Sequence, residues 1–273
     1  MKKMLEISTF FGKQTVSSYL FFMIFAVIMA ILISMILIIR SGIGIKKGLP
    51  VMILAAPLVL MGARMLYVVT HIHYYLAWPQ RAWELKLSGF SVLGGLLLAT
   101  AGCVVYAKFM SVDFWRLADL LTPGLGTGIV LTKIGCFFNG CCFGLKTDFP
   151  WAVHFPYESP AHKYYLKQAG ESGMFSLTSM IGSPAIHPTQ LYEAIGVLTA
   201  TLVAIVILVK KMNSGLAALF AAFFFILSRL ITFYFRAPVA MDENPEWFYP
   251  LLYGIILIAI VFLIQKRTCV RSK

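Results

Sequence analysis

Three basic side chains and one acidic side chain lie within, or at the edge of, long apolar stretches of the sequence: Arg64, Lys133, Arg229 and Glu193. An ionisable residue at membrane depth costs roughly 2.5–3.5 kcal/mol on insertion scales, so its presence indicates a function. Three cations and one anion that face a single cavity leave a positive excess. Such a cavity suits an anion, and arginine binds phosphate bidentately. We expect a phospholipid phosphate there; the alternative is that each cation reaches an interface or pairs locally.

A polar helix start lies before one of the later apolar stretches. It reads His-Pro-Thr-Gln-Leu-Tyr-Glu from His187 to Glu193, and proline favours the first turn of a helix. His187, Gln190 and Glu193 recur at three-residue steps, which places them on roughly one face. They either shape the mouth of a pocket or form an ordinary capped helix start at headgroup level.

A glycine-rich segment precedes that helix. Glycines stand at positions 135, 140 and 144, and this density predicts an irregular backbone after Lys133. Irregular backbone persists at membrane depth only where it lines a cavity or is buried in protein. Its N–H groups could hold phosphate oxygens. The alternative is an ordinary helix end with a turn.

Three of the five cysteines, Cys136, Cys141 and Cys142, lie in this glycine-rich segment. Near Lys133 their pKa values could be depressed, and they could then act as nucleophiles, hold an intermediate or form a redox pair. The alternative is that they are small apolar fillers. Their C-x4-C-C spacing lacks the C-x2-C pairs of zinc sites, so the spacing predicts no metal. No other cofactor is indicated.

Composition places the chain in the membrane. Of its 273 residues, 60% are hydrophobic and only 12% are charged, about half the charge of a soluble domain. Apolar runs of about twenty residues predict helices rather than a β-barrel. The net charge of +12 lies in short runs between apolar segments, which is typical of membrane orientation and not of nucleic-acid binding.

We therefore predict an all-α integral membrane protein, a single membrane domain over residues 1–273 with seven transmembrane helices. The predicted spans are Ser18–Ile39, Leu49–Val69, Gly89–Met110, Phe114–Lys133, His187–Val209, Gly215–Phe235 and Trp247–Ile264. Connections 40–48, 107–118, 209–214 and 265–273 hold eleven basic residues and few acidic ones, so they are predicted to be cytoplasmic. The N-terminus is then outside, the C-terminus is cytoplasmic, and residues 145–186 form a small cap at the outer face of a bacterial plasma membrane.

The ordered motifs resemble those of the prolipoprotein diacylglyceryl transferase family. The segment from His187 to Glu193 is similar to that family's His-Pro-Ser-Gln-Leu-Tyr-Glu run, and Gly62-Ala63-Arg64 with Tyr67 is similar to its Gly-Ala-Arg segment. Residues 133–144 line up with its signature loop, residues 229–236 resemble its arginine pair, and Tyr19 is similar to a first-span tyrosine.

The resemblance implies transfer of the diacylglyceryl group of phosphatidylglycerol to the lipobox cysteine of a lipoprotein precursor, with release of glycerol phosphate. Partners are then this anionic phospholipid and the precursor. Combined with the residue chemistry, it predicts catalytic roles for Lys133, Arg229, His187, Glu193, Cys136 and Cys141. Substrate-binding roles are predicted for Arg64, Tyr67, Tyr19, Asn139, Gly140, Gly144, Gln190, Tyr192 and Arg236.

Several positions depart from the family pattern. Lys133 replaces arginine, Cys136 replaces asparagine, Cys141 replaces glutamate, Leu93 replaces histidine and Phe233 replaces glutamate. Lysine keeps the charge but loses the planar fork, and leucine cannot act as a base. The acceptor could therefore be another protein, a glycan or a small alcohol. Alternatives are a non-catalytic paralogue that binds phospholipid or protein, and a membrane thiol redox protein.

Overall fold

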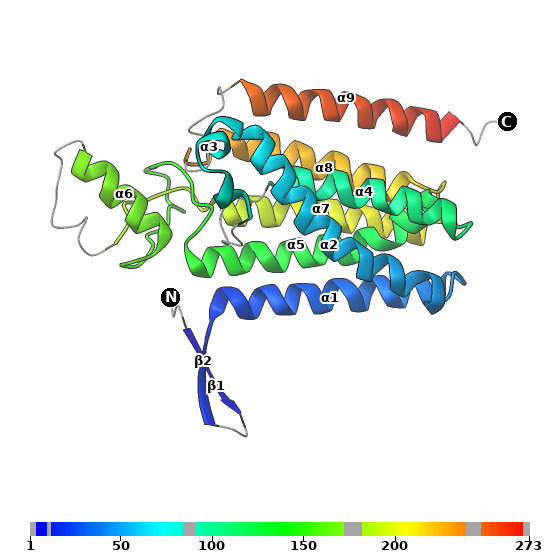
Figure 1. The fold of residues 1–273 in the computed structure, drawn as a ribbon, viewed down its shortest axis with the longest axis horizontal. Coiled ribbons are helices and arrows are strands. Elements are labelled where there is room, and N and C mark those ends of the chain that lie inside the picture. The colour runs from blue at the N-terminus through cyan, green and yellow to red at the C-terminus, as the bar shows by residue number, and fades with distance from the viewer. Residues whose placement is uncertain (1–3, 10–11, 84–90, 172–181, 239–246, 270–273) are drawn as a thin grey trace.

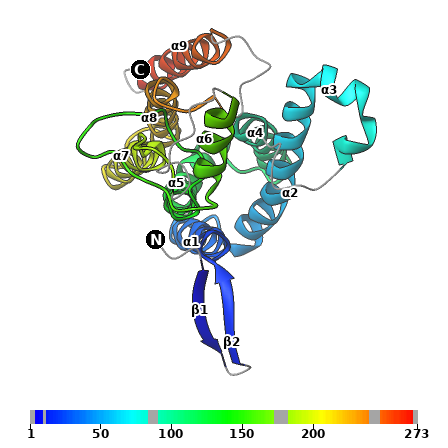
Figure 2. The same ribbon diagram turned by 90° about the vertical axis from the view of Figure 1, so that its left-hand side faces the viewer.

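The computed structural model describes residues 4–9, 12–83, 91–171, 182–238 and 247–269. Long helices run side by side, and a two-stranded antiparallel hairpin precedes them (Figures 1 and 2). The elements are β1 (Met4–Thr9), β2 (Gly12–Ser17), α1 (Ser18–Arg40), α2 (Ile45–Thr70), α3 (Ile72–Ala77), the 3-10 turn η1 (Pro79–Trp83), α4 (Val92–Phe109), α5 (Phe114–Asn139), α6 (Pro160–Glu171), α7 (Thr189–Val209), α8 (Leu216–Phe233) and α9 (Phe248–Cys269). The predicted helical class is confirmed, whereas the hairpin was not predicted.

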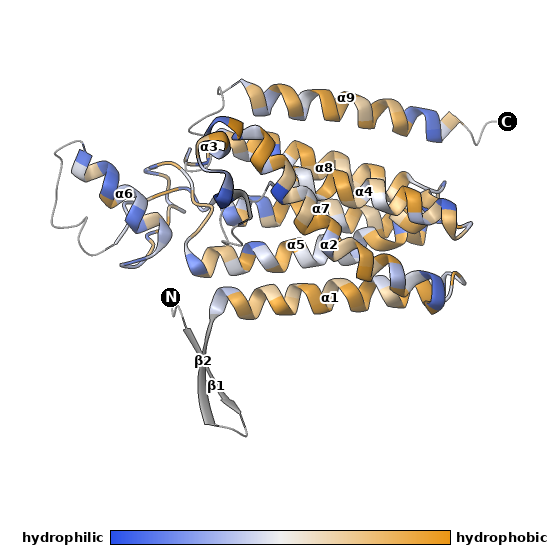
Figure 3. Cartoon of the chain, viewed as in Figure 1, coloured by the Kyte–Doolittle hydropathy of each residue, from blue (hydrophilic) through white to orange (hydrophobic). Residues whose placement is uncertain are grey.

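Six of these helices are long and apolar enough to cross a membrane: α1, α2, α5, α7, α8 and α9. Only 11–39% of the residues in their most apolar stretches are buried inside the protein, so most of the apolar surface faces outward. Figure 3 shows this apolar character along the helices. Such a surface would be unfavourable in water and fits contact with lipid. α4 is a shorter apolar helix, and the predicted start of its span at Gly89 lies outside the described residues.

α5 is the central helix of the bundle. It packs along α1 and α7 and also contacts α8. Its glycines allow this close approach: a Cβ atom at Gly124 would lie 2.5 Å from the carbonyl oxygen of Ala30 in α1, and one at Gly128 would lie 3.1 Å from the Ala30 Cβ atom. Small residues let neighbouring helices approach in membranes. α2 packs on α4, and α9 packs on α8, so both stand farther from α5.

α5 continues past the end that the sequence predicted. The predicted span stopped at Lys133, but the helix runs to Asn139. Gly135 lies within the helix and does not break it. Its role is to let α1 approach, since a Cβ atom added at Gly135 would lie 2.7 Å from the Cβ atom of Phe22. The helix ends at Gly140, whose φ of 74° is the left-handed conformation that favours glycine. The irregular backbone therefore begins at Gly140.

The described residues of the predicted cap form a compact region at one end of the bundle. α6 lies there with short β-bridges that pair Lys146 with Ile186 and Val153 with Ile186. Its apolar core is completed by neighbours outside 145–186: it consists of Phe143, Phe155, Ala161, Tyr165, Ile186 and Ala237. The cap thus shares its core with the segments that follow α5 and α8. Residues 172–181 of the predicted cap lie outside the described part.

Asp119, a buried residue of α5, caps the start of α8. Its carboxylate accepts hydrogen bonds from the backbone N–H groups of Gly215, at 2.6 Å, and Ala218, at 2.8 Å. We expect Asp119→Ala to lower stability by about 1–2 kcal/mol, because two N–H groups at a helix start lose their acceptor. Thermal unfolding in detergent micelles measures this change. Asp148→Ala, at an exposed aspartate outside the helices, is the control and should have a smaller effect. Equal effects would contradict the capping role.

Candidate functional site

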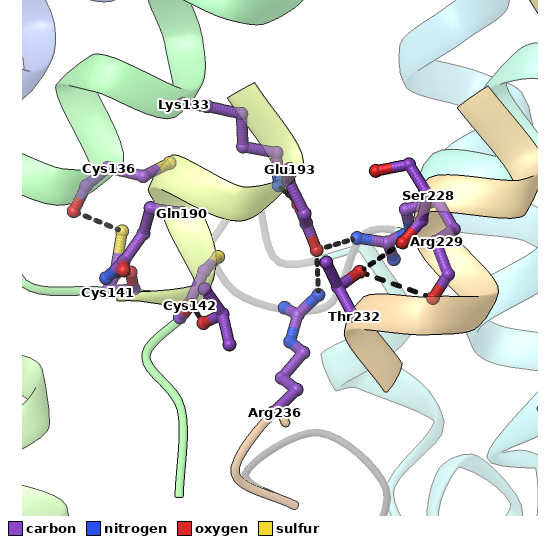
Figure 4. A network of polar contacts seen from close by, with 11 residues as sticks. Lys133, Cys136, Cys141, Cys142, Gln190, Glu193, Ser228, Arg229, Thr232 and Arg236 are labelled. Carbon is purple, nitrogen blue, oxygen red and sulfur yellow. Dashed lines mark hydrogen bonds and ion pairs between the residues drawn. The ribbon is translucent and has the colours of Figure 1, made fainter. Parts of the chain in front are cut away.

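Three cations from separate segments converge on the carboxylate of Glu193, in the second turn of α7. Arg229 of α8 lies 2.5 Å from Oε1, and Arg236, which follows α8, lies 3.4 Å from the same oxygen. Lys133 of α5 forms an ion pair with Oε2. The Glu193 side chain is only 3% exposed. Figure 4 shows the arrangement, which we call the Glu193 cluster.

The Glu193 cluster carries three positive charges and one negative charge. The three cationic side chains retain 15–20% exposure, so their remaining N–H groups can reach a bound group. Arginine has five N–H donors and lysine has three, far more than one carboxylate can accept. A positive excess in surroundings of low dielectric favours an anion beside the cations. The cluster is therefore suited to a phosphate.

The loop after α5 is joined to the start of α7 by side-chain hydrogen bonds. The Thr189 hydroxyl donates to the carbonyl of Cys142 at 2.7 Å, and the Gln190 amide donates to the carbonyl of Cys141 at 2.7 Å. Both side chains are fully buried. The other amide atom, Gln190 Oε1, has no hydrogen-bond partner among the described residues. The two bonds fix the loop relative to Glu193, one turn further along α7.

Gly144 connects this loop to Arg236. Its N–H donates to the carbonyl of His187 at 3.1 Å, and the N–H of Leu145 donates to the carbonyl of Phe235 at 2.9 Å. Gly144 and Arg236 form a β-bridge. A Cβ atom at Gly144 would lie 2.6 Å from both carbonyl oxygens, so only glycine fits. A substrate-binding role was predicted for Arg236, and its backbone pairing with Gly144 turns its side chain toward Glu193.

Three thiols lie beside the Glu193 cluster (Figure 4). The sulfur atoms of Cys136, Cys141 and Cys142 are all within 4.8 Å of one another. Hydrogen bonds from Cys136 and Cys141 lower the pKa of the Cys142 thiol, and the charges of Arg236 and Lys133 act in the same direction. The described part of the chain contains no disulfide; all five cysteines are free thiols. We call these three residues the cysteine trio.

The three polar residues predicted to share a face of α7 have different neighbours. Gln190 reaches the loop and Glu193 reaches the cations, as described above. His187 precedes the helix, its Nδ1 lies 3.1 Å from the Tyr192 hydroxyl, and burial lowers its pKa. Tyr192 also accepts a hydrogen bond from Trp151 at 2.7 Å. His187 thus belongs to an aromatic group beside the Glu193 cluster.

Arg64 is not among the cations that pair with Glu193. Its guanidinium donates to the carbonyl of Arg81 at 2.7 Å and lies over the Tyr75 ring. Tyr67, on the same helix, stacks on His71 with ring centroids 4.1 Å apart. The predicted convergence of Arg64 with Lys133 and Arg229 differs from the structure, in which Arg236 is the third cation. The reason is that α2, which carries Arg64, packs mainly against α4.

The remaining predicted residues lie around the loop. Tyr19, at the start of α1, interacts electrostatically with the cysteine trio. The Asn139 side chain forms a hydrogen bond with the Cys141 thiol. The carbonyl of Gly140 accepts a 3.0 Å hydrogen bond from Ala161 of α6. At the two positions that lost a titratable residue, Leu93 lies in the first turn of α4, and the Phe233 ring packs near Tyr249 of α9.

Comparison with known proteins shows the family. The prolipoprotein diacylglyceryl transferase family matches residues 6–270. A protein of Synechococcus is 28% identical over 151 residues, which cover 55% of this chain and 47% of the relative. One of Bacillus cereus is 25% identical over 232 residues, covering 84% of this chain and 79% of the relative. Both are named phosphatidylglycerol–prolipoprotein diacylglyceryl transferase. The chain belongs to this family of transferases.

Glu193→Gln removes the negative charge and leaves three cations together. We expect a loss of stability at the low end of the roughly 3–5 kcal/mol typical of a broken buried pair, because the cations keep some exposure. Thermal unfolding in micelles measures the loss. Glu171→Gln is the control: its pair with Lys167 is exposed on α6 and should contribute nothing measurable. An unchanged melting temperature in Glu193→Gln would show that the cations do not depend on this carboxylate.

Gly144→Ala should prevent the loop from packing between His187 and Phe235, because the added Cβ meets two backbone oxygens. We expect little folded protein after purification, measured by size-exclusion chromatography in detergent. Gly254→Ala in α9 is the matched control, since nothing lies within 4 Å of its added Cβ. Normal yield and stability of Gly144→Ala would argue against the backbone pairing described here.

Proposed function

We propose that this member of the prolipoprotein diacylglyceryl transferase family moves the diacylglyceryl group of phosphatidylglycerol to an acceptor thiol and releases glycerol phosphate. The lipobox cysteine of a lipoprotein precursor is the first acceptor to test. The observation that carries the proposal is the Glu193 cluster, with three cations on one carboxylate. Phosphatidylglycerol and prolipoprotein appear in the names of the relatives, which supports the same donor and acceptor here.

The reaction requires cations at the leaving group. The acceptor sulfur attacks the glycerol carbon of the lipid, the bond from that carbon to the phosphate oxygen breaks, and the electron pair leaves with the phosphate. A phosphodiester with one negative charge thereby becomes a monoester that gains a second. Lys133, Arg229 and Arg236 would offset this developing charge, and groups held in place before the reaction stabilise it most. The net excess of two positive charges in the Glu193 cluster matches in magnitude the two negative charges of the product.

The remaining residues of the site are assigned by their position. Glu193 holds the three cations together, so we assign it a positioning role. The backbone from Gly140 to Gly144, which carries Cys141 and Cys142, is fixed to α7 by Thr189 and Gln190, so it holds the cysteine trio beside the Glu193 cluster. His187 and Trp151 both hydrogen-bond to the Tyr192 hydroxyl, so we assign these three residues together to the aromatic group beside the cluster. Direct contacts of Arg64, Tyr67 and Tyr19 with the lipid stay predictions.

We also propose that α4 is the seventh span and that the cap and the N-terminal hairpin lie on the outer side of a bacterial plasma membrane. Two observations support this. Figure 1 shows the N-terminal hairpin at the same end as α6 and the end of α9 at the opposite end, as an odd number of spans requires. Lys210 and Lys211, between α7 and α8, and Lys266, in the last turn of α9, lie at the end of the bundle where α9 ends, since Asn213 donates a hydrogen bond to the carbonyl of Arg267. A positive excess is typical of the cytoplasmic side.

The activity can be measured with purified protein in micelles that contain phosphatidylglycerol and a lipobox peptide. We expect release of glycerol phosphate together with thioether formation on the peptide, detected by mass spectrometry. Arg229→Gln should lower turnover by about 10²–10³-fold, the effect typical of losing one preorganised donor. Lys210→Gln, at an exposed lysine far from the cluster, is the control.

Lys133→Arg tests the same site in the opposite direction. It restores the planar fork and should keep or raise turnover.

The competing function is a non-catalytic lipid-binding protein. The apolar residues Leu93 and Phe233, at positions where the family has titratable residues, favour it. Bound phosphatidylglycerol without release of glycerol phosphate, for any acceptor thiol offered, would overturn the transferase proposal and support this alternative.

A further inference from the structure

The cysteine trio has the geometry of three ligands around one metal ion. Its sulfur atoms lie within 4.8 Å of one another. With zinc–sulfur bonds of 2.3 Å and tetrahedral angles, ligand sulfurs lie about 3.8 Å apart, so a small contraction would complete a site. We propose that Cys136, Cys141 and Cys142 bind Zn²⁺ and leave its fourth position for the acceptor thiol. This inference rests on the proposed function.

The backbone conformation explains how the three sulfur atoms come together although the C-x4-C-C spacing is not that of a zinc site. Cys136 lies in the last turn of α5, and the left-handed Gly140 then reverses the chain. Cys142 has a φ of 56°, an unfavourable conformation for a residue with a side chain, and the surrounding bonds hold it there. The carbonyl groups of Cys141 and Cys142 are held by Gln190 and Thr189. The three sulfurs are thus positioned by one tight loop rather than by two C-x2-C pairs.

The donor set leaves one position open. Among the described residues, the group contains three thiols and no histidine, aspartate or glutamate. Structural zinc sites have four protein ligands, whereas catalytic sites have three and keep one position for water or substrate. Gln190 Oε1 is buried near the trio without a hydrogen-bond partner among the described residues. It can accept a hydrogen bond from the S–H group of the entering acceptor before coordination removes that proton.

The surrounding charge favours an anionic metal complex. Zn²⁺ with three thiolates carries one negative charge, and with a fourth thiolate it carries two. Lys133 and Arg236 interact electrostatically with Cys142, and both belong to the Glu193 cluster with its positive excess. Desolvated charges are tolerated when opposite charges lie beside them. Soft thiolate ligands select zinc or Cu(I), and zinc adds no redox step to a group transfer.

A zinc ion here would replace the missing proton acceptor. The acceptor thiol binds the fourth position and loses its proton, because coordination deprotonates a thiol outright. The zinc-bound sulfur then attacks the glycerol carbon of the lipid, the carbon–oxygen bond to phosphate breaks, and the phosphate leaves with the electron pair. The released proton goes to the phosphate monoester or to solvent, and the neutral thioether leaves the metal. No oxidant or reductant is required. No base is needed at position 93, where this chain has leucine.

Metal binding is tested on the full-length protein in detergent, after treatment with a chelator and confirmation that the thiols are reduced. Co²⁺ serves as the probe for the zinc site, since sulfur ligation produces a charge-transfer band. We expect one Co²⁺ per chain, displaced by Zn²⁺. Cys136→Ser, Cys141→Ser and Cys142→Ser should each lose the band. Cys103→Ser and Cys269→Ser, outside the trio, are the matched controls and should keep it.

A second measurement needs no variant. Zn²⁺ should protect the cysteine trio of the wild-type protein from alkylation and leave Cys103 and Cys269 unprotected, as read by peptide mass spectrometry. A lipobox peptide should change the visible Co²⁺ spectrum, and the same peptide with serine in place of cysteine should not. The inference would be overturned if the protein with reduced thiols bound no metal or bound Cu(I) alone. Equal metal binding by the variant in which Cys136, Cys141 and Cys142 are all replaced by serine would also overturn it.

The two proposals fail in different ways. If the chelator-treated protein binds Co²⁺ and Zn²⁺ as expected but the zinc-loaded protein releases no glycerol phosphate with any thiol, the metal site is supported and the transferase function is wrong. If the chelated protein, shown to contain no metal, turns over as fast as the zinc-loaded protein, the transferase function stands and the catalytic role of zinc is wrong.

Discussion

The structure depends on one buried carboxylate that is shared by three cations. Glu193 joins α7 to α5, to α8 and to the segment that follows α8, because each of these three supplies one of its cationic partners. Without the carboxylate, three positive charges would face one another in apolar surroundings, which is strongly unfavourable. With it, the charges are held together but not cancelled. The remaining excess is the physical basis for assigning an anionic lipid to this end of the bundle.

The loop after α5 holds the cysteine trio next to the Glu193 cluster. Gly140 ends the helix, Gly144 lets the backbone pass between two carbonyl groups, and the side chains of Thr189 and Gln190 fix the turn between them. The same few residues therefore position a cationic group and a group of thiols. A transfer from a phospholipid to a thiol needs both, one for the leaving phosphate and one for the attacking sulfur.

The sequence predicted the elements of the bundle well because apolar run length determines which segments can cross a membrane. It placed Lys133, Arg229 and Glu193 within or at the edge of apolar stretches, and in the structure the three lie together, with Glu193 buried and the two cations partly exposed. It assigned Arg236 to the site only through the family resemblance, because the turn of this side chain toward Glu193 depends on backbone pairing with Gly144, which lies 92 positions earlier in the chain. It placed Arg64 with the other cations because periodicity does not say which helices are neighbours. The convergence of Cys136 with Cys141 and Cys142 depends on the conformations of Gly140 and Cys142, which spacing alone does not indicate.

The most direct test of the central claim is native mass spectrometry of the protein with phosphatidylglycerol and, separately, with diacylglycerol, which lacks the phosphate. We expect the wild-type protein to retain phosphatidylglycerol in preference to diacylglycerol. The double variant Arg229→Gln/Arg236→Gln should lose this preference, and Arg64→Gln should lose less of it. Equal retention of both lipids by the wild-type protein, or a larger loss in Arg64→Gln than in the double variant, would contradict the assignment of the Glu193 cluster as the headgroup site.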